Sequence, residues 1–335
     1  MVNDKPKMLT ESGKVIKAMS PIIVSASRST DIPAFYADWF MNRLKAGFCD
    51  WVNPFNREVY RVSFAKTRMI VFWSKNPRPM LERLDELEGL GYRNYYFQFT
   101  LNDYESEGLE PNVPPLASRI ETFRELAARI GKARVIWRFD PLLLSETVTV
   151  DTLLSRILAI GRQVKDCTEK LVFSFADIEA YRKVVSNLRG TGCREFSQED
   201  RETFVRGLVE INAELGLTLA TCAEDVDLSR YAVLHNKCID DDLMVRLFHD
   251  DQQLMDFLGA EYDMFGGWKI AKSKKDKGQR KACGCVVSKD IGMYNTCPHL
   301  CRYCYANSSD QIVLANCRKH QKAPFESALI PDEVE

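Results

Sequence analysis

Short apolar runs alternate with amphipathic segments along most of this chain. The apolar runs are rich in β-branched and aromatic residues, which favours buried strands. The segments between them place apolar residues three or four positions apart, and some end on glycine, as helices do. The predicted strands are at residues 21–27, 68–76, 94–102, 133–141, 170–177 and 216–225. Strands that alternate with helices in this way predict parallel βα units.

The number of units favours an α/β fold built as a partial (β/α) barrel of six to seven parallel strands, similar to a TIM barrel. Residues 51–64 have the pattern of a β-hairpin inserted between the first two units. The expected layout is an N-terminal tail at 1–20, barrel units at 21–265, a basic linker with a cysteine-bearing unit at 266–310, and a C-terminal tail at 311–335.

Nearly every predicted strand ends in polar residues. They include Arg28, Thr30, Asp31, Ser74, Lys75, Gln98, Thr100, Arg138, Asp140, Ser174, Asp177, Cys222 and Glu224. In a parallel βα barrel the C-terminal ends of the strands form the active-site face. About half of these residues can be explained as turn formers or helix caps. The rest predict a functional site at this end of the sheet.

The composition of the chain indicates which compartment and which classes of partner to expect. The 335 residues are 45% hydrophobic with a net charge of −1, so the chain can bury a full core and has no overall field for nucleic acid or membranes. No apolar run approaches the length of a membrane span, and the first residues are polar. We therefore expect a cytoplasmic protein with no membrane partner. Eleven cysteines in a reducing compartment suggest metal ligation rather than disulfides.

The strongest chemical signal is the spacing C-x3-C-x2-C of Cys297, Cys301 and Cys304. A structural zinc site would use two C-x2-C pairs, and Cys283 with Cys285 would make a poor second pair. A compact loop with mixed spacing suits an iron–sulfur cluster better, and three ligands leave one iron open. We favour the cluster over zinc.

The same motif resembles the signature of the radical S-adenosylmethionine superfamily, and the sequence YCYAN is similar to its spore photoproduct lyase-like branch. The segments TDIPAFY, FWSKNPRPMLERLDEL, the stretch from FQFTLN to the following helix, and VIWRFDPLL are similar to successive segments of that branch. In that superfamily the cysteine motif follows the first strand, whereas here it lies near the C-terminus. The resemblance therefore implies a circularly permuted barrel, which is feasible because the first and last units of a barrel are neighbours. As a whole, the chain also resembles a bacterial family known only as a domain of unknown function.

The resemblance also implies a cofactor site. The residues around the cofactor would be Thr30, Asp31, Lys75, Gln98, Thr100, Arg138 and Tyr303. Thr30 and Asp31 would lie near the amino group of S-adenosylmethionine, and Lys75 would meet its carboxylate. Gln98 with Thr100 would lie at the ribose, although the family usually has a serine where Gln98 stands. Each could equally be a polar group of the barrel mouth whose hydrogen bonds are satisfied there.

Four further cysteines form a second candidate group: Cys222, Cys238, Cys283 and Cys285. They predict an auxiliary metal site, either an iron–sulfur cluster or zinc. The alternative is that Cys222 and Cys238 are small buried hydrophobic residues. The Cys283–Gly–Cys285 pair is harder to explain in that way, because adjacent thiols without a metal are prone to oxidation.

We therefore expect a radical S-adenosylmethionine enzyme with a [4Fe–4S] cluster, which takes electrons from a donor such as flavodoxin or ferredoxin and acts on a substrate that the sequence does not identify. The alternatives are a zinc-dependent barrel hydrolase and a non-catalytic iron–sulfur sensor. The basic stretch at 268–281 is read first as a solvated linker, and nucleic-acid binding is the less favoured interpretation.

Overall fold

The structure is a computed structural model that describes residues 7–9, 15–264 and 266–331. Its centre is an eight-stranded sheet in which all strands are parallel, in the order β11-β10-β9-β8-β7-β6-β3-β14. In chain order these strands are β3 (Ile23–Ala26), β6 (Met69–Ser74), β7 (Tyr95–Thr100), β8 (Val135–Leu142), β9 (Lys170–Phe175), β10 (Thr218–Thr221), β11 (Leu234–His235) and β14 (Lys289–Asp290). The expectation of an α/β fold with a parallel sheet is confirmed.

The sheet has more strands than the six to seven that the sequence predicts. The two strands that no predicted run covers, β11 and β14, are two residues long and form the two edges of the sheet. So short a strand contains no alternation of apolar and polar residues for a sequence pattern to detect. Among the described residues, β11 and β14 form the two edges of the large sheet, and no pairing joins them into a closed barrel.

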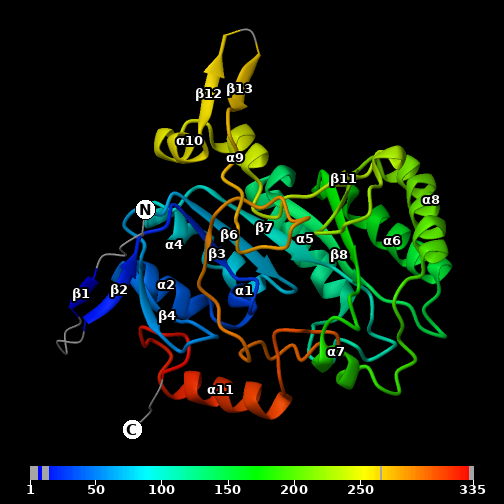
Figure 1. Cartoon of the computed structure of the whole chain (residues 1–335), viewed down its shortest axis with the longest axis horizontal. Helices are drawn as coiled ribbons and strands as arrows, with labels where there is room; N and C mark the ends of the chain where they lie inside the picture. Colours follow the sequence, from blue (N-terminus) through cyan, green and yellow to red (C-terminus); the bar gives the residue numbers. More distant parts are fainter. Residues whose placement is uncertain (1–6, 10–14, 265, 332–335) are drawn as a thin grey trace.

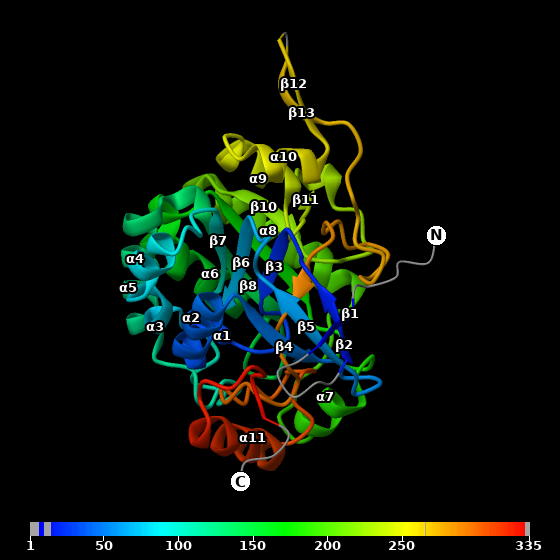
Figure 2. The ribbon, with the colours of Figure 1, turned by 90° about the vertical axis from the view of Figure 1, so that its left-hand side faces the viewer.

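Helices connect successive strands. They are α1 (Ile32–Phe35), α2 (Ala37–Ala46), α3 (Arg78–Leu81), α4 (Leu84–Gly89), α5 (Leu116–Ile130), α6 (Val150–Val164), α7 (Arg182–Asn187), α8 (Gln198–Leu215), α9 (Asp241–Phe248), α10 (Gln252–Leu258) and α11 (Asp310–Lys322). Short 3-10 turns lie at η1 (Lys132–Arg134), η2 (Lys165–Cys167) and η3 (Ser229–Tyr231). In both views α7 and α11 lie at one end of the molecule, opposite the projecting hairpin of β12 (Ala260–Asp263) and β13 (Gly267–Ile270) (Figures 1 and 2).

A smaller sheet in the order β1-β2-β5-β4 lies beside the first βα unit. It contains β1 (Lys7–Leu9), β2 (Val15–Met19), β4 (Phe48–Val52) and β5 (Val59–Ser63). β4 and β5 pair antiparallel where the sequence predicts a hairpin at 51–64, but the first strand begins earlier, at Phe48. The regions expected to be tails contain structure: β2 pairs with β5 near the N-terminus, and α11 follows residue 310. Residues 1–6, 10–14 and 332–335 of those two regions lie outside the described residues.

Both faces of the large sheet are buried, as is usual for parallel strands. On β7, Phe97 and Phe99 point to the helix-covered face, where Phe99 lies 5.1 Å from the ring of Phe123 on α5. Tyr96 and Gln98 alternate with them and are also buried, at 0% and 1% exposure. Tyr96 belongs to a second apolar cluster together with residues of α9, α10 and the segment that carries Cys283 and Cys285. The C-terminal third of the chain therefore covers the second face of the sheet.

Candidate functional site

A cavity of about 510 Å³ lies at the C-terminal ends of the parallel strands. All of the site residues predicted from the sequence line this cavity except Gln98. They are Thr30, Asp31, Lys75, Thr100, Arg138, Cys222, Cys238, Cys283, Cys285, Cys297, Cys301, Tyr303 and Cys304. The fold therefore brings both cysteine groups and the polar strand ends to one place.

The cysteines of the C-x3-C-x2-C motif lie in one loop after β14. The side-chain amide of Asn307 donates to the carbonyl of Cys297 at 2.9 Å and draws the two ends of the loop together. Cys301 is buried, and Cys297 and Cys304 are half-buried. Burial raises the pKa of all three thiols. A positive charge within this loop, such as that of a metal, is therefore needed to favour the thiolate forms that act as ligands.

Asp290, the last residue of β14, fixes the start of this loop. Its carboxylate accepts hydrogen bonds from the hydroxyls of Ser25 (2.9 Å) and Ser27 (2.8 Å) and from the backbone N–H of Arg28 (2.7 Å). A Cβ on Gly292 would lie 1.8 Å from Oγ of Ser27, so this approach requires glycine. The cysteine loop is thus tied to the end of β3.

Asp31 connects four parts of the site. One carboxylate oxygen accepts from the hydroxyl of Ser74 (2.7 Å) and from the N–H of Ala34 (3.0 Å), which caps α1. The other lies 2.8 Å from the N–H of Lys75 and 2.9 Å from Nε2 of His299, which stands between the first two motif cysteines. Both oxygens of Asp31 already have two partners. In the structure these four bonds position the cysteine loop. The contact with the amino group of S-adenosylmethionine that the resemblance implies would be a fifth bond to the same carboxylate.

Lys75 lies in a buried polar cluster. Its ammonium group donates to Glu110 at 2.7 Å and to the hydroxyl of Tyr303 at 2.9 Å, and that hydroxyl also donates to Glu110. Burial alone would raise the pKa of Glu110, but the charges of Lys75 and Arg119 outweigh it and lower the pKa to about 2. The positive charge of Lys75 is therefore already paired with the carboxylate of Glu110, and the carboxylate of a cofactor would have to share it.

Two of the predicted ribose contacts differ in their surroundings. Gln98 is buried away from the cavity, where its amide donates to the carbonyl of Cys238 at 2.8 Å and accepts from Arg138 at 3.2 Å. Gln98 therefore does not line the cavity, and both ends of its amide are already bonded to Cys238 and Arg138. Thr100 does line the cavity. Thr30 lines it as well, and its buried hydroxyl has no hydrogen-bond partner among the described residues.

Arg138 lines the cavity but is 2% exposed and extensively bonded. Its guanidinium pairs with Asp140 and donates to the sulfur of Cys238 at 3.0 Å. The guanidinium also lies 5.2 Å from the ring of Trp73. These contacts place Arg138 beside the second cysteine group rather than beside the motif loop.

The structure brings the four cysteines of the second group together. The sulfurs of Cys222 and Cys238 are 3.3 Å apart. Cys285 interacts through its thiol with both Cys238 and Cys283. Cys238 is also buried in the second apolar cluster and Cys222 packs against it, so the alternative that they are small buried hydrophobic residues stays open beside the metal site.

Three residues of the site were missed or passed over in the sequence. Glu110 and His299 are distant in the sequence from the residues that they contact, Lys75 and Asp31, so only the fold brings these pairs together. Glu224, seen only as a polar strand end, lines the cavity and accepts from the N–H of Phe175 at 2.9 Å. Burial raises the pKa of Glu224 to about 7.

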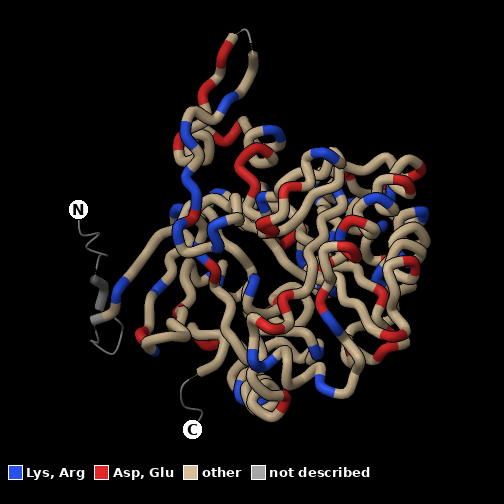
Figure 3. Tube along the Cα trace, turned by 45° about the vertical axis from the view of Figure 1, so that its right-hand side comes forward, with Lys and Arg blue, Asp and Glu red and all other residues tan. Residues whose placement is uncertain are grey.

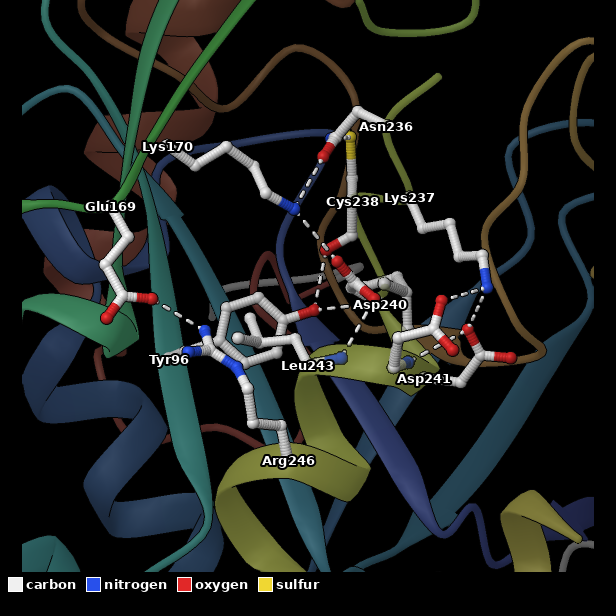
Figure 4. Close-up of polar contacts among 12 residues, drawn as sticks. Tyr96, Glu169, Lys170, Asn236, Lys237, Cys238, Asp240, Asp241, Leu243 and Arg246 are labelled. Carbon is white, nitrogen blue, oxygen red and sulfur yellow. Dashed lines mark hydrogen bonds and ion pairs between the residues drawn. The ribbon is translucent and has the colours of Figure 1, made fainter. Parts of the chain in front are cut away.

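A group of three acidic residues at the start of α9 resembles a metal site, but each of the three forms an ion pair with a lysine. Asp240, Asp241 and Asp242 bring carboxylate oxygens within 4.8 Å of one another. Lys237 donates to Asp241 and Asp242 at 2.7 Å each, and Lys170 donates to Asp240 at 3.1 Å. Figure 4 shows both lysines pointing at these carboxylates. The group is explained by ion pairing at a helix N-terminus.

The basic stretch at 268–281 contains residues with identified acidic partners. Lys269 pairs with Asp263 at 2.8 Å, and Arg280 pairs with Asp177 at 2.6 Å. Basic and acidic positions are interspersed along the chain in this view, including the projecting hairpin (Figure 3). Gly278, Gln279 and Arg280 nevertheless reach the cavity wall. The stretch is therefore part of the site's border, and two of its seven basic residues form ion pairs with acidic residues.

Among the helices of the described residues, none combines the length and the apolar character needed to cross a bilayer. Comparisons with curated proteins and with solved structures gave no match. One protein family does match, over residues 23–306, which covers the large sheet, the cavity and all seven cysteines of the two groups. The chain belongs to this family, described as a domain of unknown function (DUF1848).

Proposed function

We propose that the protein is a radical S-adenosylmethionine enzyme in which Cys297, Cys301 and Cys304 ligate a [4Fe–4S] cluster. One observation carries this proposal. The three thiols lie in a single loop that directly follows a parallel strand and faces a cavity at the C-terminal strand ends. This is where a βα barrel holds its chemistry.

The position of β14 supports the idea of a circularly permuted partial barrel. β14 is the last strand of the large sheet in chain order, yet in space it pairs beside β3, the first. The strand order then runs β14, β3, β6, β7, β8, β9, β10, β11, each strand next to its successor. A cysteine motif that follows the first strand in the superfamily would follow β14 here, so the tail unit would take the first place in the barrel.

The donor set suits a cluster better than a single zinc ion. Four thiolates around zinc would be about 3.8 Å apart, given a Zn–S distance of about 2.3 Å. No three cysteine sulfurs among the described residues lie within 4.8 Å of one another. Three thiols in one loop would leave one iron of a cube open. This spacing disfavours the zinc-dependent hydrolase.

The cavity offers a place for the second cofactor. With S-adenosylmethionine bound, a cluster in this loop would supply the one-electron reduction that cleaves it to methionine and a 5′-deoxyadenosyl radical. The hydroxyl of Thr30 is free to bond a ligand polar group, and a ligand that does so would satisfy a buried donor. A donor such as flavodoxin or ferredoxin would provide the electron, and the substrate would occupy the rest of the cavity.

The chain's own residues position the loop and set its charge. Asp31 bonds His299 and thereby orients the segment between the first two motif cysteines. Lys75 opposes the effect of burial on the pKa of Cys301 and so favours its thiolate form. Glu110 and Tyr303 in turn hold the Lys75 ammonium in place.

The test is anaerobic reconstitution with iron and sulfide, followed by an assay for 5′-deoxyadenosine with dithionite and S-adenosylmethionine. We expect the wild type to form 5′-deoxyadenosine. The variant with Cys297, Cys301 and Cys304 all changed to alanine should lose about four iron per chain and all cleavage. Cys167→Ala is the matched control, because Cys167 is a half-buried thiol in η2 that does not line the cavity.

Two outcomes would go against the proposal. A triple variant that keeps wild-type iron and cleavage would show that the motif is not the cluster site. A wild type that binds four iron but never cleaves S-adenosylmethionine under strong reduction would favour the iron–sulfur sensor instead.

A further inference from the structure

The second cysteine group is assembled from three separate segments. Cys222 follows β10, Cys238 lies in the loop between β11 and α9, and Cys283 and Cys285 lie in the segment before β14. The sulfur of Cys238 is 3.3 Å from that of Cys222, and the thiol of Cys285 interacts with those of Cys238 and Cys283. All four thiols are free and line the cavity.

The backbone of Cys238 is held on two sides. Its carbonyl accepts from the hydroxyl of Tyr96 at 2.7 Å and from the amide of Gln98 at 2.8 Å. The N–H of Asp240 donates back to the hydroxyl of Tyr96 at 2.9 Å, so the loop is clamped to β7 (Figure 4). A small buried hydrophobic residue does not need such a clamp, whereas a ligand that must hold its sulfur in place does.

Several N–H groups point at the sulfurs of the group. Arg138 donates to Cys238 at 3.0 Å and Asn236 donates to it at 3.3 Å. The backbone N–H of Ile239 donates to the sulfur of Cys285, also at 3.3 Å. Hydrogen bonds to sulfur from charged and amide donors stabilise thiolates and are the contacts that tune iron–sulfur clusters.

A further cation faces the same cavity. Arg28 lies over the ring of Trp73 at 5.5 Å, and one of its terminal nitrogens is buried without a hydrogen-bond partner in the described part of the chain. A cluster held by four thiolates is anionic, so nearby guanidinium groups offset its charge. Arg28 supplies one such charge, whereas Arg138 donates a hydrogen bond to Cys238 while its own charge is paired with Asp140.

We propose that Cys222, Cys238, Cys283 and Cys285 ligate a second metal centre, an iron–sulfur cluster in the wall of the cavity. Cys222 and Cys238 are closer, at 3.3 Å, than the about 3.8 Å of two thiolates on one zinc ion, and no three of the four sulfurs lie within 4.8 Å of one another. The preference for iron–sulfur over zinc therefore rests on the N–H donors to sulfur and on the unpaired guanidinium nitrogen of Arg28. Four thiolates would occupy every corner iron of a cube and leave none open for S-adenosylmethionine. The inference goes beyond the proposed function and does not depend on the motif loop holding a cluster.

The test compares metal content in anaerobically reconstituted full-length variants. The wild type should hold about eight iron per chain and no stoichiometric zinc. The double variant Cys238→Ala/Cys285→Ala should keep about four iron, and so should the motif triple variant. The cluster that remains in the motif triple variant should give an electron paramagnetic resonance signal that S-adenosylmethionine does not change. The control Cys167→Ala should hold as much iron as the wild type.

The two proposals fail in different ways. Iron lost from the double variant but not from the motif triple variant would overturn the proposed function and leave this inference standing. If the double variant holds as much iron as the wild type, the second site is wrong. Zinc lost from the double variant with unchanged iron would overturn the iron–sulfur assignment.

A second variant covers the case in which the two alanine substitutions prevent folding. Cys238→Ser/Cys285→Ser keeps the size of both side chains and is the second variant. The motif triple variant gives an independent measurement, because it leaves the four cysteines of the second group unchanged. A folded triple variant that holds no iron overturns the inference.

Discussion

The two cysteine groups on the cavity wall are built in opposite ways. Cys297, Cys301 and Cys304 lie in one loop, and their spacing could be read directly from the sequence. Cys222, Cys238 and the pair at 283 and 285 come from three segments and meet only because β10, β11 and the segment before β14 converge. A local group carries its own geometry, whereas a dispersed group depends on the fold for it. The two should therefore respond differently to changes elsewhere in the protein.

The largest effect should come from the buried ion pair beside the local group. In Lys75→Ala, the carboxylate of Glu110, whose side chain is 1% exposed, loses its closest cation. We expect the free energy of unfolding to fall by about 3 kcal/mol, measured by denaturant titration. The double variant Lys75→Ala/Glu110→Gln should recover most of this loss, because it no longer buries an unpaired charge.

Lys75 also allows the cofactor expectation to be tested separately. If Lys75 meets the carboxylate of S-adenosylmethionine, the stable double variant should still bind it roughly 10- to 100-fold more weakly, the cost of about 1.5–3 kcal/mol for a charged contact. Unchanged affinity in the double variant would remove Lys75 from the cofactor site. Cluster content at the second group should not change.

The next effect should come from the joint between β14 and β3. Gly292→Ala places a Cβ 1.8 Å from Oγ and 2.6 Å from Cβ of Ser27, which Asp290 holds. We expect a loss of about 1–3 kcal/mol in thermal or denaturant unfolding and reduced iron at the motif loop. Gly89→Ala is the control, since nothing lies within 4 Å of its Cβ position. A Gly292→Ala variant as stable as Gly89→Ala would contradict this account of the joint.

The smallest effect should come from the clamp on the dispersed group. Tyr96→Phe removes the hydroxyl that bonds both the carbonyl of Cys238 and the N–H of Asp240. We expect about 1 kcal/mol of lost stability and a lower metal content at the second group only. Tyr262→Phe, at an exposed tyrosine on the hairpin, should change neither. Equal loss of iron from both groups would show that the clamp supports the whole sheet rather than one site.

Local features of this protein could be predicted from its sequence, whereas features that depend on tertiary contacts could not. The six longer strands could be predicted because each is a buried apolar run, and the motif cysteines because their spacing is local. The edge strands β11 and β14 could not, because two residues carry no pattern. The partners of Asp31 and Lys75 could not either, since His299 and Glu110 reach them through tertiary contacts. The orientation of Gln98 could not be predicted either, because a strand-end position in the sequence does not tell whether a side chain lines the cavity or bonds a neighbouring loop.

The pairing of β14 with β3 has a consequence for how the protein is made. Ser27 and Asp290 are 263 residues apart, and a ribosome needs roughly 10 to 50 s to synthesise that length. During that interval the outer edge of β3 waits without its neighbouring strand, as an exposed template for other β-strands. The motif loop follows β14, so its cysteines leave the ribosome after every other strand of the large sheet. If the motif loop holds a metal as proposed, it would bind it only after β14 has been synthesised. A nascent chain that stalls before β14 would expose the sheet edge to aggregation.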